Sequence, residues 1–523
     1  MKKLIQFLSL VLGMLFILGG VTIAGEEMPS VTLKYNSQYR PERKERCIPQ
    51  YKDWKEAKWP VPFEDPNSKL PFWVRNWNYW ARKTGNKDWI AWGRRLANPK
   101  GIKLGLDWIK LNGIDCSKIV ALSKIAPDIR PGVTITQENW KQYEKGLKEL
   151  WPKSLWLRIT NNCYIPYKKI TICPTQHIYK SRGVLYWTKK YLNHAHIDKE
   201  GMMDLSLDNY VAGVPFPFVP ACAKWDDPKM SLGDRYGDKY AWWIVHDMDR
   251  LVVGQDQLSF NPIIPSLYDR HAKLERTLKW GLYWRIYWGR MDLPPMPYVP
   301  GQEDIESKGS IAAIYPFDIR GFAATRWRYC DKNKEALFMC YLPALRRTRR
   351  LSGSDTQDPI LGTDLTWEDW KVWWQKISQK IWPSKAVTLR AEEILVPVMW
   401  DKRFHFDEKN FIITYYERRP SWVIDYIAVP PSDYFYKVRR AWIDFEVKRV
   451  NYNECYDQRL RLWRTWLDFK RWYPETGYFT WWGCDIPDHV NRHWTLLQME
   501  AVVNDPKITD SYFDLRFLSR MAH

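Results

Sequence analysis

The sequence predicts a mainly β fold with flanking helices, in which one curved antiparallel sheet forms an incomplete barrel. Apolar and polar side chains alternate with a period of two in residues 422–429 and 438–446, as in antiparallel strands. Successive extended segments are joined by short connections, which leave little room for the crossover helices of a parallel sheet. The 33 Trp, 30 Tyr and 19 Phe among 523 residues supply bulky side chains for a wide sheet.

Residues 1–24 have the pattern of a signal peptide. Lys2 and Lys3 precede an apolar run, and Thr22 and Ala24 stand at the two positions that a signal peptidase inspects. An uncleaved membrane anchor is the alternative, since the run is nearly long enough to span a bilayer. We expect cleavage after Ala24 and export to the periplasm of a Gram-negative bacterium.

The chain is strongly basic. Its formal net charge is +20, and removal of Lys2 and Lys3 leaves +18. In an exported protein this charge favours anionic lipid head groups, lipopolysaccharide or acidic ligands over nucleic acid, although solubility alone also explains it.

All nine Cys lie beyond the cleavage point, and none forms a C-x-x-C motif, which disfavours thioredoxin-like chemistry, zinc ribbons and haem attachment. Export permits disulfides. The nearly symmetric stretch CYIPYKKITIC, residues 163–173, would form a hairpin with its two sulfurs opposite each other. Cys163 and Cys173 are therefore a candidate disulfide.

Changes in composition divide the mature chain into three parts. Residues 25–122 carry many Trp and Pro without a clear period, which predicts an irregular Trp-rich extension wrapped on the main body. Residues 123–470 hold the extended segments of the curved-sheet domain. Residues 471–523 are expected to form a C-terminal extension.

The elements of the main domain follow in order. Residues 136–151 have an apolar stripe at helical spacing, which Thr136 caps and Pro152 ends. Short β-rich segments bounded by turn residues predict strands at 155–160, 170–173, 310–314, 321–330, 335–342, 345–351, 387–395, 411–416, 422–429 and 438–446. Clustered Trp and Ile residues predict a helix at 367–380.

The apolar faces of the last two strands are expected to line the concave side of the sheet. The side chains that we assign to a hydrophobic-ligand site there are Trp422, Ile424, Tyr426, Ile443 and Phe445. So many strands predict an arc wider than its own side chains can fill. Complete filling by a helix and the N-terminal extension is one alternative, and stacking against sugar rings or aromatic compounds is another.

Four arginines follow one another closely at Arg346, Arg347, Arg349 and Arg350. They precede the carboxylates Asp355, Asp358, Asp364, Glu368 and Asp369. The preferred interpretation is a structural network of ion pairs that clamps a long loop. The alternative is an anion-binding site at a cavity mouth, in which Arg347 and Arg349 bind the ligand.

Catalytic and metal-binding patterns are weak. The sequence contains no G-x-S-x-G, P-loop or G-x-G-x-x-G motif, and its carboxylates are too numerous to single out a catalytic pair. His194 with His196, and His489 with His493, are poor metal candidates. We therefore expect no cofactor, no metal and no catalytic residue.

Several stretches resemble a family of exported proteins of unknown function that are described as outer-membrane lipoprotein-sorting-like. The most specific is CYLPALRRTRRL at residues 340–351, followed by the Asp-rich loop with GTDL at 362–365. IRPGVTITQENWKQY at 129–143, AGVPFP at 212–217 and the Tyr456-Asp457 pair that ends residues 439–457 occur in the same order as in that family. The resemblance covers about 125–470.

This family in turn resembles the LolA and LolB lipoprotein carriers, which fold as an incomplete barrel around an apolar cavity. The resemblance implies a non-enzymatic periplasmic carrier of a lipid or another hydrophobic molecule, with an outer-membrane or efflux protein as candidate partner. It also implies a place at the outer membrane's periphery. The alternative is a periplasmic glycan- or aromatic-compound-binding protein or enzyme.

The signal sequence predicts that the mature protein begins at Gly25. Mass analysis of the amino terminus, on protein purified from the native host, checks this cleavage. Intact Met1 in the membrane fraction would show that the apolar run is an anchor.

Overall fold

The computed structural model describes residues 33, 68–156, 159, 169–217, 219–220, 223–251, 255–352, 354–398 and 415–521. The predicted signal peptide lies outside them, as does Cys163 of the candidate disulfide. All described elements belong to one unit, residues 31–523. No helix among the described residues is both long enough and apolar enough to cross a membrane.

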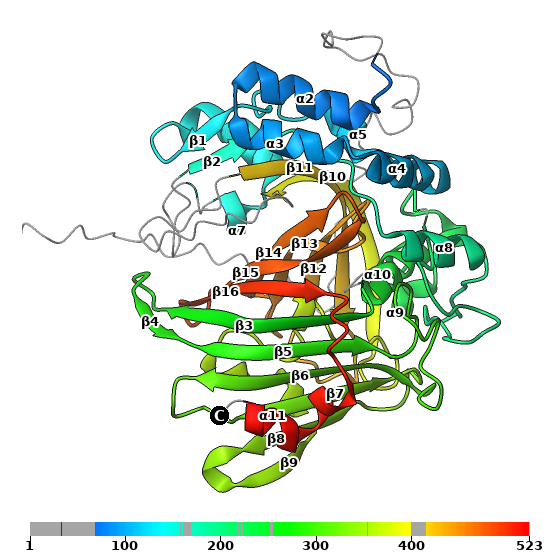
Figure 1. Cartoon of the computed structure of the whole chain (residues 1–523), viewed down its shortest axis with the longest axis vertical. Coiled ribbons are helices and arrows are strands. Elements are labelled where there is room, and N and C mark those ends of the chain that lie inside the picture. Colours follow the sequence, from blue (N-terminus) through cyan, green and yellow to red (C-terminus); the bar gives the residue numbers. More distant parts are fainter. Residues whose placement is uncertain are drawn as a thin grey trace, which may run out of the picture. The chain divides into compact units, whose positions relative to one another are not determined.

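Sixteen strands form one large curved, unclosed sheet (Figure 1). The strands are β1 (Thr134–Thr136), β2 (Lys169–Ile172), β3 (Gln257–Tyr268), β4 (Leu274–Thr277), β5 (Lys279–Ile286), β6 (Ile305–Tyr315), β7 (Ala323–Tyr329), β8 (Leu337–Leu342), β9 (Arg347–Leu351), β10 (Ser384–Pro397), β11 (Tyr415–Ala428), β12 (Val438–Asp444), β13 (Val450–Tyr456), β14 (Leu462–Tyr473), β15 (Tyr478–Asp488) and β16 (His493–Val503). Their order is β1-β2-β11-β12-β13-β14-β15-β16-β3-β5-β6-β7-β8-β9, with β10 on β11 and β4 on β3. The pairs are antiparallel except for β2 with β11. The predicted antiparallel curved sheet is confirmed.

Ten α-helices in the described part of the chain flank the sheet. They are α2 (Phe72–Thr84), α3 (Lys87–Leu96), α4 (Pro99–Asn112), α5 (Cys116–Ala121), α6 (Glu144–Leu150), α7 (Lys153–Trp156), α8 (Arg182–Lys190), α9 (Gly233–Tyr236), α10 (Lys239–Leu251) and α11 (Leu515–Met521). Local sequence sets the ends of the first four helices, α2 to α5. Side chains of Asn86, Asn98 and Asp115 accept first-turn N–H bonds. Gly85 and Gly113 end α2 and α4 with φ of 64° and 71°, which a side chain would disfavour.

Strand β11 shows how the sheet separates two cores. Trp422, Ile424 and Tyr426 point into the core on the concave face, whereas Val423 and Ile427 belong to the core on the outer face. The predicted alternation is therefore correct. The polar face that was expected to meet solvent is not observed, because every position from 416 to 428 is buried.

The outer face is covered by other parts of the chain. Its core includes Leu147 and Leu150 of α6, which pack with strand residues. Asp425 is fully buried on this face and pairs with Arg440, with 2.8 Å between Oδ1 and Nε. Pairing replaces the hydration that burial removes, so charged residues occupy positions that the pattern predicted to face water.

Two predicted elements are wrong, and one is correct in part. Residues 367–380 form only a single short 3-10 turn at Trp370–Val372. Residues 155 and 156 belong to α7 instead of a strand. The helix expected over 136–151 is split, because its first residue ends β1 and the regular helix begins at Glu144.

The C-terminal part has a larger role than expected. The boundary at residue 470 falls inside β14, and β15 and β16 join β14 to β3 in the middle of the sheet. The N-terminal extension is helical in its described part, and its Trp residues share a core with Trp472 and Phe479 from β14 and β15. Residues from both ends of the chain are therefore integral to the fold.

A buried charge network ties the helical layer to the sheet. Arg419 of β11 donates to both carboxylate oxygens of Asp444, at 2.8 and 2.9 Å, and to Glu446 at 3.0 Å. Glu446 also accepts the backbone N–H of Cys116 in α5 and contacts His177 Nδ1 at 2.6 Å. Burial by itself would raise the pKa of Asp444, but Arg419 lowers it to about 2.

Loss of this arginine is expected to be severe. Arg419→Ala leaves two buried carboxylates without their counter-charge, so the free energy of unfolding should fall by about 3–5 kcal/mol. Urea unfolding followed by circular dichroism measures the change. Arg461→Ala is the control, because Arg461 is 47% exposed and pairs with Asp457 at the surface. That variant should lose less than about 1 kcal/mol, and equal losses would contradict a clamping role for Arg419.

Candidate functional site

The connection between β9 and β10 fills much of the concave side of the sheet. We call residues 354–383 the plug segment. Its indole rings each meet a different strand, with ring centroids 4.7 Å apart for Trp367 and Phe338, 4.9 Å for Trp374 and Trp284, and 4.9 Å for Trp373 and Tyr426. A regular helix would not spread its Trp side chains over three separate strands, which explains why the predicted helix at 367–380 does not form.

Polar contacts fix the plug segment to the wall of the sheet. Three of its five carboxylates pair with Arg326 (Glu368, 2.9 Å), Arg439 (Asp369, 3.0 Å) and His493 (Asp364, 2.7 Å). Lys376 Nζ donates to the backbone oxygens of Tyr329, Asp331 and Lys334 at 2.7–3.0 Å. The segment is therefore held from several strands at once.

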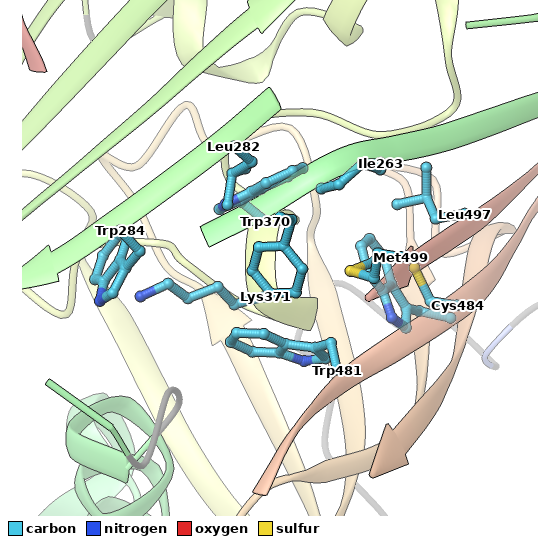
Figure 2. A pocket seen from close by; sticks show the side chains of 11 residues that line it. Ile263, Leu282, Trp284, Trp370, Lys371, Trp481, Cys484, Leu497 and Met499 are labelled. Carbon is cyan, nitrogen blue, oxygen red and sulfur yellow. The ribbon is translucent and has the colours of Figure 1, made fainter. Parts of the chain in front are cut away.

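A small cavity remains between the plug segment and strands β3, β5, β14, β15 and β16. Its volume is about 30 Å³, which is room for about one or two water molecules. Residues that line it include Phe260, Trp284, Lys371, Trp481, Cys484 and Met499 (Figure 2). Apart from the amine of Lys371, the lining is almost entirely apolar. The arc is thus nearly filled, and the free space expected from the strand count is not present in this conformation.

Lys371 is the unusual residue of this cavity. Its side chain is 9% exposed and reaches toward Trp284, with Nζ over the indole ring (Figure 2). Within the described residues, Nζ makes no hydrogen bond and no ion pair. Burial lowers the pKa of Lys371 well below its usual value, because removal from water disfavours the charged form of the amine.

The backbone at this point is strained. Lys371 and Val372 have φ of 58° and 74°, the left-handed region that β-branched residues rarely adopt. The carbonyl of Lys371 accepts from Arg449 at 3.2 Å, and that of Val372 accepts from Arg439 at 3.0 Å. These bonds hold the strained turn and direct the Lys371 side chain into the cavity.

Among the described residues, the concave core contains hydrogen-bond donors without acceptors, and three of them belong to residues that line the cavity, Trp284, Trp466 and Trp481. In the described part of the chain, the following buried indole N–H groups of the concave core have no protein partner: Trp280, Trp284, Trp373, Trp374, Trp422, Trp466 and Trp481. Buried polar groups ordinarily find a partner, and each exception calls for an explanation. The interior of the sheet is therefore apolar but rich in donors.

The five residues predicted to bind a ligand lie together on the concave face, but none lines this cavity. Trp422 and Phe445 are in ring contact at 4.3 Å. Tyr426 lies beneath Trp373 of the plug segment and Trp242 of α10, and its hydroxyl is 2.6 Å from Ser384 Oγ. Ile424 and Ile443 are fully buried in the same core.

The arginine cluster is not the expected network. Arg347 and Arg349 lie on β9 at the edge of the sheet, and every residue from 346 to 350 is exposed. Within the described residues, their guanidinium groups form no ion pair or side-chain hydrogen bond. The buried carboxylates of the plug segment pair with other strands, and Asp355 accepts from Ser352. The expected ion-pair network does not form, because the strand that carries these arginines lies at the edge of the sheet and is exposed to water.

Lys371 was missed by sequence reasoning. The signal available in the sequence was a single lysine within the Trp-rich run WEDWKVWW, residues 367–374. The weak histidine candidates behave as ordinary residues: His194 and His196 are exposed, and His493 pairs with Asp364.

A further cluster, Asp115, His177 and Glu446, places one potential ligand atom from each residue within 4.8 Å of the others. It belongs to the buried network of Arg419. Glu446 already accepts two backbone N–H groups and the guanidinium, and Asp115 caps α5. This donor set is satisfied by the protein, and the adjacent positive charge disfavours a cation.

Comparison with solved structures relates the chain to two proteins at low identity. A DUF1329 family protein from Desulfovibrio piger is 16% identical, with a TM-score of 0.37 over 51% of this chain and 96% of that one. A LolA superfamily protein from Nitrosomonas europaea is 14% identical, with a TM-score of 0.33 over 52% and 97%. A search of curated proteins found no match.

The family model described as "Protein of unknown function (DUF1329)" matches residues 134–515. That range contains every strand of the sheet, the plug segment and Lys371. It also contains the arginine strand on which the sequence resemblance rested, so the expected relation to a family of unknown function is confirmed. The chain therefore belongs to the DUF1329 family.

Proposed function

We propose that the protein is a non-enzymatic periplasmic binding protein or carrier, and that its ligand is a hydrophobic molecule with an acidic or carbonyl head. One observation carries this proposal: the cavity of the curved sheet is apolar, yet its lining includes Lys371 and three Trp residues, Trp284, Trp466 and Trp481, whose indole N–H groups have no protein partner within the described ranges. The apolar part of such a ligand would pack against the aromatic side chains that line the cavity. Oxygen atoms on its head satisfy the donors.

The lysine favours an anionic head. Burial disfavours the charged form of this amine, and a carboxylate or phosphate that enters beside it would stabilise that form as an ion pair. Charge-assisted hydrogen bonds of this kind are the strong ones. A lipid acid or phospholipid is therefore a better ligand class than a hydrocarbon.

The plug segment must move for a ligand of that size to enter. A volume of about 30 Å³ does not hold an acyl chain. The Trp side chains of the plug segment now pack on the concave face, and displacement of Trp373 would uncover Tyr426 of the predicted ligand-binding set. The strained turn at Lys371 and Val372 lowers the free energy that this displacement requires.

A second candidate function has support from a different place. A groove of about 700 Å³ lies between α4, α8 and the β14–β15 turn, and it is lined by Lys100, Arg182, Tyr186 and Asp292 among others. Burial, with a smaller effect of Asp256, raises the pKa of Asp292 to about 7. A protonatable carboxyl beside an exposed tyrosine suits a glycan-binding protein or enzyme.

Ligand identity is tested by native mass spectrometry of protein purified gently from its host. We expect a bound lipid acid or phospholipid, released on denaturation. Retention of a glycan, with no lipid mass, would support the groove instead. Protein that carries no small molecule and takes up neither oleate nor a dansyl-labelled fatty acid would contradict the carrier proposal.

Lys371→Met and Lys376→Met form a matched pair within the plug segment. Lys371→Met removes a buried amine without an acceptor, so the free energy of unfolding should rise by about 1–3 kcal/mol. Its affinity for oleate should fall about tenfold or more through loss of a charge-assisted bond, while binding of oleyl alcohol changes little. Lys376→Met removes the donor to three carbonyls and should instead destabilise by about 1–3 kcal/mol.

Displacement of a dansyl-labelled fatty acid measures the two affinities, and urea unfolding measures stability. Unchanged oleate binding in a stable Lys371→Met protein would exclude the lysine from the ligand site. It would leave the apolar site itself intact as a proposal, since oleyl alcohol binding tests that separately.

A further inference from the structure

Three neighbouring turns of the sheet lie at the same end of their strands. They connect β3 to β5 through β4, β6 to β7, and β8 to β9 (Figure 1). Because consecutive strands are antiparallel, alternate turns fall at one end of the sheet. We call residues 269–279, 315–322 and 343–351 the basic rim. The last range includes the edge strand β9, in which Arg347 pairs with Leu342 at this end of β8 and Arg350 pairs with Met339 farther along it.

Charge is distributed unequally between the two ends of these strands. The basic rim contains nine Arg and Lys against three Asp and Glu. The turns at the opposite end, residues 287–304 and 330–336, contain three Arg and Lys against five Asp and Glu. The strands thus carry a positive end and a slightly negative end.

Large apolar side chains stand exposed within the basic rim. Phe317 is 87% exposed, Leu345 64%, Tyr315 52% and Leu274 44%. Phe317 and Leu345 lie near the tips of two turns, and Lys279 Nζ is 5.8 Å from the ring of Tyr315. Exposed apolar groups among cations are unusual on a surface that only has to remain in water.

Partners inside the protein account for several of these cations, including Arg270, whose Nε is 3.0 Å from His271 Nε2, and Arg320. Asp318 pairs with Arg276 at 2.6 Å, and Glu275 lies 3.2 Å from His493. The guanidinium groups of Arg346, Arg347, Arg349 and Arg350 have no side-chain partner among the described residues. Charge on an edge strand also prevents edge-to-edge pairing, but that role does not explain the exposed Phe317 and Leu345.

We propose that the basic rim is a docking surface for an anionic lipid membrane. Arginine forks suit phosphate head groups, and aromatic and leucine side chains at turn tips insert at the boundary between head groups and acyl chains. The two features occur together in the basic rim. This inference stands on different residues from the ligand site and does not depend on it.

The orientation has a consequence for the proposed cavity. The plug segment reaches the same end of the sheet. There Asp364 pairs with His493, and the backbone N–H of Phe435 in the β11–β12 turn donates to Gln357 Oε1. A membrane bound to the basic rim would therefore lie near the segment that covers the concave face.

Vesicle co-sedimentation of the mature chain tests the docking surface. Vesicles of phosphatidylglycerol and phosphatidylcholine in equal parts should bind the protein, and vesicles of phosphatidylcholine alone should bind at least tenfold less. Binding should weaken as NaCl rises from about 50 mM to about 500 mM, because salt screens exposed charges. Binding to neither vesicle would overturn the proposal, as expected if the basic rim instead serves an acidic protein.

Two variants of equal charge locate the surface. Arg347→Glu with Arg349→Glu should lower binding to anionic vesicles at least tenfold, and Phe317→Ser should lower it severalfold and leave the salt dependence in place. Lys199→Glu with Lys229→Glu changes exposed lysines outside the basic rim and should stay within twofold of wild type. Thermal melting checks that all variants fold. Equal losses in both double variants would mean that net charge alone drives binding and would overturn the docking surface.

Discussion

A sheet of sixteen strands that does not close exposes two faces and leaves free edges, and the same chain has to cover them. In a closed barrel, side chains fill the interior and no edge remains. Here the concave face is too wide for its own side chains, so a long connection enters it. The plug segment supplies Trp367, Trp373 and Trp374, whose rings pack against three separate strands.

This way of filling the arc explains several features that look costly in isolation. Burying the indole N–H of Trp373 or Trp374 without an acceptor is unfavourable, as is burying the amine of Lys371. The contacts that hold them there, such as Asp369 with Arg439 and Glu368 with Arg326, lie on the wall of the sheet. Ion pairs of its carboxylates thus anchor the plug segment, whereas donor groups near its centre lack hydrogen-bond acceptors in the described part of the chain. That combination suits a cover whose central part exchanges with a ligand.

The outer layers serve a different purpose. Helices α2 to α4 share a core with Trp472 of β14 and Phe479 of β15, and the buried network of Arg419 joins α5 to β11 and to the turn after β12. In that network Asp444 and Glu446 are both paired with Arg419. Charged side chains therefore differ between two places. Those of the Arg419 network are buried and paired, whereas the arginines of β9 are exposed and form no ion pair among the described residues.

Local patterns in the sequence determined the strands between residues 310 and 351 and between 387 and 446, the alternation of Trp422, Ile424 and Tyr426, and the family resemblance, because period and turn residues act over short distances. Two outcomes depended on distant parts of the chain. Residues 367–380 have helical spacing, yet their Trp side chains meet β5, β8 and β11, and that packing outweighs local propensity. The partners of Asp364, Glu368 and Asp369 come from β16, β7 and β12, not from the nearby arginines. Lys371 became a site residue only because the plug segment turns inward there, and no local rule sets which strand a buried charge will meet.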